Sequence, residues 1–159
     1  DCLALNPSHL SLLIGTNDAM AMRRKEIPAD PAIWARGLAG LLRETLRRIP
    51  HVKILVMEPF QILGEETDAT TIGHCKSLAR EARRVAADLE VGFLPLQRHF
   101  DKQNDGIAWI YDGIHPTARG HWLIAQQWLK WCRRTRWIGT SNLNRAKREI
   151  YPEVEALQW

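Results

Sequence analysis

The stretch VKILVMEP, residues 52–59, decides the fold class of this chain. Its first six residues hold five apolar side chains and one lysine, without the apolar–polar alternation of a strand that has one wet face. A run of this kind is typical of a strand buried on both faces, and such strands occur in parallel sheets that helices cover on both sides. The stretch therefore predicts a central strand of an α/β protein.

The segments on either side of this strand alternate between strand and helix patterns. Short apolar runs predict the strands, and apolar residues at helical spacing mark the segments between and after them. This alternation is typical of a parallel sheet with helices on both faces, because each helix carries the chain back to the start of the next strand. The expected strands span 9–14, 52–58 and 91–96, the expected helices 31–49, 72–89 and 117–132, and a long loop 97–115.

Composition and length fit one globular domain. The chain has 159 residues, of which 45% are hydrophobic and 25% charged, and its formal net charge is +4. We expect the domain to span residues 1–137 and a weakly patterned C-terminal tail to span 138–159. The three cysteines form no metal-binding or disulfide pattern, so we expect no metal and no cofactor. No apolar run approaches the roughly 20 residues that a membrane span needs.

Two polar clusters follow strands of the expected sheet. The first is SLLIGTND, residues 11–18, in which an apolar run ends on a glycine and then presents an amide beside a carboxylate. The second is YDGIHPTARGH, residues 111–121, which follows the last expected strand after the long loop. In a parallel sheet, ligands bind outside the carboxyl ends of the strands. The two clusters are therefore predicted to lie at the same edge of the sheet.

Each cluster allows an active-site interpretation and a purely structural one. Asp112 and His115 are three residues apart across a glycine, so the carboxylate can fold back onto the imidazole and leave its other nitrogen free as a base. The same residues are also common in turns and at helix starts. Asn17 can donate its amide to an oxyanion, but asparagine after a strand is also an ordinary turn former. Neither cluster decides the question alone.

The stretch IGTND, followed some hundred residues later by YDGIHPTARGH, resembles two sequence blocks of the SGNH (also called GDSL) hydrolase superfamily. The likeness is to its lysophospholipase- and esterase-like branch, and it covers most of residues 3 to 131. It implies a three-layer αβα sandwich with a parallel, flavodoxin-like sheet. It also implies a serine ester hydrolase that acts on a small-molecule ester.

The resemblance assigns roles to particular residues. Asn17 would be the oxyanion-hole side chain, His115 the general base, and Asp112 the carboxylate that orients the base. The neighbouring residues of the first cluster would mostly shape the site loop; they are Gly15, Thr16 and Asp18.

The chain departs from the family pattern at its start. The family's blocks with the nucleophilic serine and an oxyanion glycine lie before the first cluster, and no serine of this chain can replace that nucleophile. The four serines fall before or within the first strand, on a helix and in the tail: Ser8, Ser11, Ser77 and Ser141. We therefore expect an N-terminally truncated hydrolase, with its nucleophile upstream and the chain itself inactive.

Two further expectations follow from the truncation. Strand 9–14 should have an unpaired edge through which chains can associate. The compartment is unknown, since the true N-terminus is expected to be missing, and the cytoplasm is the default.

Three other functions remain open at the level of sequence. The chain could be a non-catalytic ligand- or carbohydrate-binding module on the same scaffold. Its basic, tryptophan-containing C-terminal third motivates a nucleic-acid binder, but those tryptophans fall on the expected apolar face of a helix, so no nucleic acid is expected. A nucleotide binder would need a glycine-rich phosphate loop after a strand, and the first cluster has a single glycine.

Overall fold

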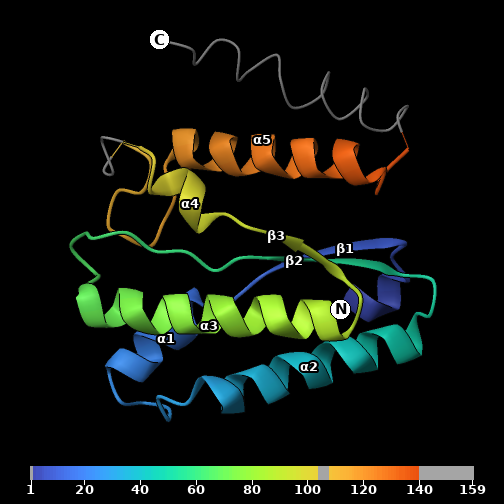
Figure 1. Cartoon of the computed structure of the whole chain (residues 1–159), viewed down its shortest axis with the longest axis horizontal. Coiled ribbons are helices and arrows are strands. Elements are labelled where there is room, and N and C mark those ends of the chain that lie inside the picture. The colour runs from blue at the N-terminus through green and yellow to red at the C-terminus, as the bar shows by residue number, and fades with distance from the viewer. Residues whose placement is uncertain (1, 104–107, 140–159) are drawn as a thin grey trace.

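A computed structural model describes residues 2–103 and 108–139 of the chain. Figure 1 shows its elements, with α5 over one face of the sheet and α1, α2 and α3 over the other. In chain order the elements are the 3₁₀ helix Cys2–Leu5, β1 His9–Leu13, α1 Thr16–Arg23, α2 Pro31–Arg48, β2 Lys53–Met57, α3 Ala69–Asp88, β3 Gly92–Leu94, α4 Gln97–Phe100 and α5 Ala118–Thr135.

The sheet is parallel, and β2 is its central strand. β2 pairs with β1 along one edge and with β3 along the other, both in parallel, so the strand order is β1-β2-β3. In this register Leu12 lies opposite Val56, and Met57 lies opposite Leu94. The parallel α/β architecture predicted from residues 52–59 is therefore confirmed.

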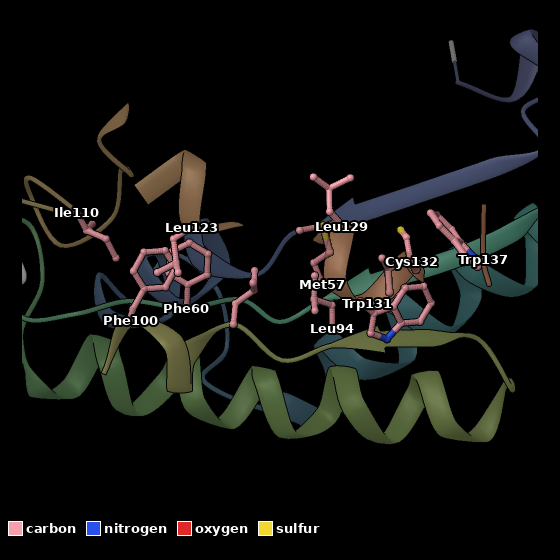
Figure 2. Close-up of a cluster of buried hydrophobic side chains, with 12 residues drawn as sticks. Met57, Phe60, Leu94, Phe100, Ile110, Leu123, Leu129, Trp131, Cys132 and Trp137 are labelled. Carbon is pink, nitrogen blue, oxygen red and sulfur yellow. The ribbon is translucent and has the colours of Figure 1, made fainter. Parts of the chain in front are cut away.

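The side chains of β2 alternate between two hydrophobic cores. Leu55 and Met57 belong to the core on the α5 side, which Figure 2 shows with Leu129 and Trp131 of that helix. Ile54 and Val56 belong to the core that α2 and α3 cover. A strand with both faces buried has no place for alternating polar residues, which explains why its sequence is an almost continuous apolar run.

Side-chain caps set where the long helices begin. Asp30 accepts the Ala32 N–H at the start of α2, and Asp68 accepts the Thr71 N–H at the start of α3. The Thr117 side chain accepts the Gly120 N–H, and α5 begins at Ala118. The helix ends at Thr135, three residues beyond the expected end. The tail expected over 138–159 lies almost entirely outside the described residues, and the domain boundary stays a prediction.

Two expected loops contain helices. The residues after Gly15 form the first turn of α1, not an extended loop, and α4 occupies the start of the loop expected over 97–115. Both helices are short, with eight and four residues. They lack the long apolar periodicity by which helices are recognised in sequence.

β1 forms one of the two edges of the described sheet, and β3 forms the other. Within the described residues β1 has no partner on the side away from β2, and Leu13 and Ile14 at its end are exposed. An unpaired edge of this kind is a template for another strand. Association through it stays a prediction.

Candidate functional site

The first polar cluster sits at the N-terminus of α1. Gly15 is the N-cap of the helix and has φ of 115°, a backbone conformation that side-chain-bearing residues rarely adopt. A Cβ atom there would lie 3.2 Å from both Pro59 and Trp34, so the site also requires a close approach of the backbone. The glycine turns the chain sharply from β1 into α1. Asn17 is thereby placed in the first helical turn with its side chain exposed.

The second cluster is a tight turn closed by one carboxylate. Asp112 Oδ1 accepts the backbone N–H groups of Ile114 and His115, at 2.9 and 2.7 Å. Asp112 Oδ2 lies 2.5 Å from Nδ1 of the His115 ring. The carboxylate thus contacts both the backbone and the ring of the residue three positions later. His115 is held in one orientation.

The side chains of Asp112 and His115 differ in how far they are exposed to solvent. The Asp112 side chain is 12% exposed and the His115 side chain 62%. Burial raises the pKa of the Asp112 carboxyl, but the hydrogen bonds from the His115 backbone, the His115 ring and the Ile114 backbone outweigh it and lower that pKa to about 2. The carboxylate is therefore ionised at neutral pH. Because Nδ1 faces it, the imidazole Nε2 is the nitrogen left for other chemistry.

The loop after β2 joins the two clusters. The Gln61 side-chain amide donates to the Thr16 carbonyl at 3.4 Å, at the start of α1. In the next residue, the Ile62 N–H donates to the Gly113 carbonyl at 3.2 Å, inside the Asp112 turn. The parallel strands β1 and β2 end at the same edge of the sheet, and this loop follows β2 directly. The structure therefore brings both clusters to one edge.

Two glycines allow this loop to pack against the Asp112 turn. A Cβ atom on Gly64 would collide with the backbone of Asp112 and Gly113. A Cβ atom on Gly113, whose φ is 95°, would collide with the hydroxyl of Thr67. The Glu66 N–H also donates to the Asp112 carbonyl, at 3.0 Å. Backbone contact without side chains fixes the turn against the sheet edge.

Three supporting residues were missed by the sequence analysis. Glu58 Oε2 accepts the N–H groups of Leu96 and Gln97 at 2.6 and 2.9 Å, which ties the end of β2 to the end of β3. The Gln97 side chain exchanges two hydrogen bonds with the backbone of Gln61. Gln61 is fully buried, and its Oε1 has no hydrogen-bond partner among the described residues. The only signal for Gln61 in the sequence was its position shortly after the apolar run of β2.

The described serines lie elsewhere in the fold. Ser8 hydrogen-bonds the ring of the adjacent His9, and Ser11, within β1, accepts the Trp128 indole N–H. Ser77 lies on α3 and donates to the Gly73 carbonyl. None of the three forms a hydrogen bond with the Asp112–His115 pair.

The described residues offer no grouped metal ligands and no membrane-spanning helix. Over residues 2–103 and 108–139, no three His, Cys, Asp or Glu side chains are grouped so that they could hold a metal ion. No helix within those ranges has the length and apolar character needed to cross a membrane.

Comparison with known protein families assigns the chain to a family. A family model, described as the GDSL-like lipase/acylhydrolase family, matches residues 1–123. The chain belongs to this family. It is a family of carboxylic ester hydrolases, and the predicted membership of the GDSL hydrolase superfamily is confirmed.

Individual relatives agree with this assignment. An acetylxylan esterase from Geobacillus stearothermophilus is 28% identical over 140 residues, which cover 82% of this chain and 61% of the relative. A protein from Parabacteroides merdae assigned to the GDSL-like lipases superimposes with a TM-score of 0.77 at 29% identity, over 82% of this chain and 62% of that one. The solved acetylxylan esterase from G. stearothermophilus gives a TM-score of 0.69 at 25% identity, over the same shares. The chain thus spans a little over three fifths of the length of these relatives.

Variants of the solved acetylxylan esterase identify catalytic positions in that protein. Three of them are described as catalytic mutants, in which a serine near the start of the protein, an aspartate, and a histidine three positions after the aspartate are each replaced by alanine. A further variant changes the tryptophan directly before that aspartate to isoleucine.

Proposed function

We propose that the protein is a serine ester hydrolase in which His115 is the general base, Asp112 orients it, and Asn17 donates to the oxyanion. The nucleophilic serine comes from a segment upstream of this chain. One observation carries the proposal. The Asp112 carboxylate lies within hydrogen-bond distance of Nδ1 of the exposed His115, at the sheet edge where α1 begins. The family membership of the chain gives that pair its chemistry.

The geometry of the pair suits general-base catalysis. An ionised Asp112 accepts the Nδ1–H of His115, so Nε2 carries the lone pair and faces away from the carboxylate. Nε2 takes the proton of the serine hydroxyl as the serine oxygen attacks the ester carbonyl, and the protonated ring then gives that proton to the departing alcohol. Water, activated by the same nitrogen, releases the acyl group from the serine.

The start of α1 suits stabilisation of the oxyanion. Asn17 presents an exposed amide in the first helical turn. The free N–H groups of a helix N-terminus give this end a partial positive charge, which favours an anion. A single oxyanion donor contributes roughly 10²–10³ to the rate when it meets charge that develops in the transition state.

The upstream position of the serine has two supports. The described serines, Ser8, Ser11 and Ser77, have hydrogen-bond partners away from His115, and Ser141 lies outside the described residues. In the acetylxylan esterase, the replaced serine lies far upstream of the Asp-x-x-His positions. The same spacing of aspartate and histidine in this chain is Asp112 and His115.

The substrate class we propose is a carboxylic ester with a small acyl group. Acetylated xylan is the first natural substrate to test, because the acetylxylan esterase relative is named for it. The test compares this chain with a longer polypeptide that includes the upstream segment, using p-nitrophenyl acetate and acetylated xylan.

The expected result separates the two polypeptides. The 159-residue chain hydrolyses p-nitrophenyl acetate no faster than its His115→Ala variant, whereas the longer polypeptide turns the ester over. In the longer polypeptide Asn17→Ala lowers kcat by roughly 10²–10³, while Gln126→Ala, which removes an amide on α5, leaves kcat unchanged. An inert longer polypeptide would replace this proposal with a non-catalytic ligand- or carbohydrate-binding module. An active polypeptide whose kcat Asn17→Ala leaves unchanged would contradict the role of Asn17 as the oxyanion donor.

A further inference from the structure

A groove runs between α3 and α4, formed by two adjoining hollows. One hollow, of about 360 Å³, is lined by four cationic side chains, two carboxylates and three uncharged residues. The other, of about 450 Å³, is lined mainly by apolar residues. The two share Lys76, Gln97 and Asp101, so they form one continuous groove with two different ends.

The cationic end holds four positive side chains: Lys76, Arg80, Arg83 and Arg98. Within the described residues, none of the four forms an ion pair with a carboxylate. Side chains without a carboxylate contact three of them, and Arg98 Nε donates to the His99 ring at 3.3 Å. The Arg83 guanidinium lies 4.9 Å from the centroid of the Phe93 ring, and Arg80 donates to the Ser77 hydroxyl at 2.9 Å. These contacts orient the guanidinium groups without neutralising their charge.

The two carboxylates in this hollow already have donors. Glu58 accepts two backbone N–H groups, and Asp101 accepts the Gln97 side-chain amide at 2.8 Å. The surroundings are positive as well. Burial lowers the pKa of the nearby His99, and the charges of Arg98 and other cations near it lower that pKa further. The hollow therefore combines free cationic donors with a net positive field.

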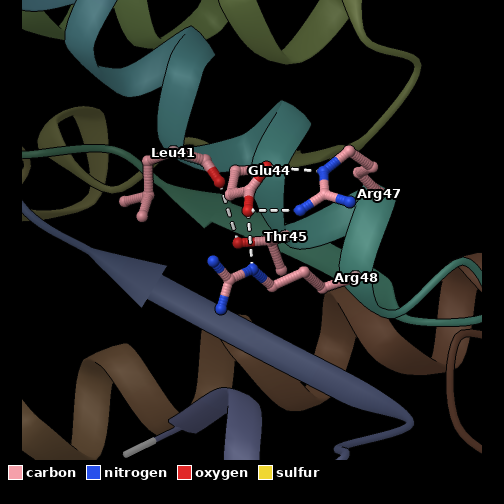
Figure 3. A network of polar contacts seen from close by, with 5 residues as sticks. All are labelled: Leu41, Glu44, Thr45, Arg47 and Arg48. Carbon is pink, nitrogen blue, oxygen red and sulfur yellow. Dashed lines mark hydrogen bonds and ion pairs between the residues drawn. The ribbon is translucent and has the colours of Figure 1, made fainter.

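Three arginines outside the groove have carboxylate partners. On α3, Arg84 pairs with Glu81 at 2.8 Å. On α2, Glu44 bridges Arg47 and Arg48, as Figure 3 shows. These three arginines have carboxylates three or four residues away, whereas Arg36 and Arg43 of α2 have no such ion pair within the described residues. The arginines of the groove lack such partners.

The other end of the groove is apolar. It is lined by Ile62 and Leu63 of the loop after β2 and by Ala69 and Ile72 of α3. Leu63 is 71% exposed, so its side chain is accessible to a ligand in this hollow. An alkyl group lying here would remove this surface from water.

We propose that this groove binds a small amphiphilic anion, with a phosphate or carboxylate head among the four cations and a short alkyl chain against Ile62, Leu63 and Ile72. The cations supply charge-assisted hydrogen bonds to the head, and the apolar end supplies hydrophobic contact for the chain. Asp112 and His115 line neither hollow, but the apolar end adjoins their turn, because the Ile62 N–H donates to the Gly113 carbonyl. Binding there does not depend on the presence of the nucleophile.

The test titrates ¹⁵N-labelled protein with octyl phosphate below its micellar concentration and follows the amide resonances. Binding should shift the resonances of residues 62–63 and 76–83. Arg80→Gln and Arg83→Gln should each weaken binding about tenfold, the effect of losing one charge-assisted hydrogen bond. Arg84→Gln removes the neighbouring, paired arginine and should leave the affinity unchanged.

Two further ligands separate the head from the chain. Inorganic phosphate should bind more weakly than octyl phosphate at the same cationic residues, and uncharged octanol should not bind there. Leu63→Ser should weaken octyl phosphate but not inorganic phosphate. The proposal is overturned if octyl phosphate causes no shifts, if its shifts centre on Asp112 and His115, if both ligands bind equally, or if Arg84→Gln weakens binding as much as Arg83→Gln.

Discussion

Replacing Asp112 by asparagine tests the geometry of the site in the chain as it stands. Asparagine has nearly the same shape and can still accept the backbone N–H groups of Ile114 and His115 through its carbonyl oxygen. It loses the charge, and its amide group replaces the oxygen that accepts from the His115 ring. The change therefore removes the charge-dependent part of the turn and keeps its shape.

The lowered pKa of Asp112 gives the size of the effect. The folded protein lowers this pKa from 3.8 to about 2, so the ionised carboxylate stabilises the fold above the unfolded-state pKa and loses that contribution as pH falls towards 2. One pKa unit corresponds to about 1.4 kcal/mol. Asp112→Asn should therefore lower the free energy of unfolding by about 2 kcal/mol at pH 6 and by about 1 kcal/mol at pH 3.

Urea denaturation at pH 6, 4 and 3, followed by tryptophan fluorescence, measures this difference. Glu65→Gln serves as the control, because Glu65 is exposed and makes no side-chain hydrogen bond or ion pair within the described residues. Its effect should stay within about 0.5 kcal/mol at each pH. A loss for Asp112→Asn that is the same at pH 3 as at pH 6, or no loss at pH 6, would refute the reasoning.

Two other predictions concern the backbone and the thiols. Gly113→Ala should destabilise the protein by at least about 2 kcal/mol in the same denaturation assay, because of strain at positive φ and collision with the neighbouring loop. Gly40→Ala should stabilise α2 by about 0.5–1 kcal/mol, because an added Cβ there meets nothing within 4 Å. Equal effects of the two substitutions would contradict this account. With Ellman's reagent at pH 8, exposed Cys2 should react at once. Cys75 and Cys132, whose pKa values burial raises to about 12, should react only after unfolding, and fast reaction of all three thiols in the native protein would contradict the buried cores.

The sequence predicted the elements whose signal is local and repeated. Residues 52–57 are apolar except for Lys53, because β2 is buried on both faces, and the long helices show their apolar stripes over many turns. The Asp112–His115 contact was also predictable, because the two residues are three apart and the glycine between them lets the turn close. In each case the sequence signal lies in residues that are close together in the chain.

The remaining features depend on contacts between distant segments. Gln61 reaches Thr16 across 45 positions and Gln97 across 36, and a pattern along the chain carries no sign of such pairs. The groove likewise forms only when α4 lies beside α3, which places Arg98 near Arg80 and Arg83. Tertiary packing creates these sites, so sequence periodicity could not reveal them.

The most direct test of the proposed site is the kcat of the longer, serine-containing polypeptide for p-nitrophenyl acetate after His115→Ala. His121→Ala is the matched control, because His121 is also exposed and lies six residues later on α5. Without the base the serine stays a poor nucleophile, so His115→Ala should lower kcat by about 10⁴-fold or more. The loss should be on the order of 10⁶-fold if the serine, His115 and Asp112 act together as a triad, while His121→Ala retains the activity. Equal kcat values for the two variants would contradict the assignment of His115 as the base.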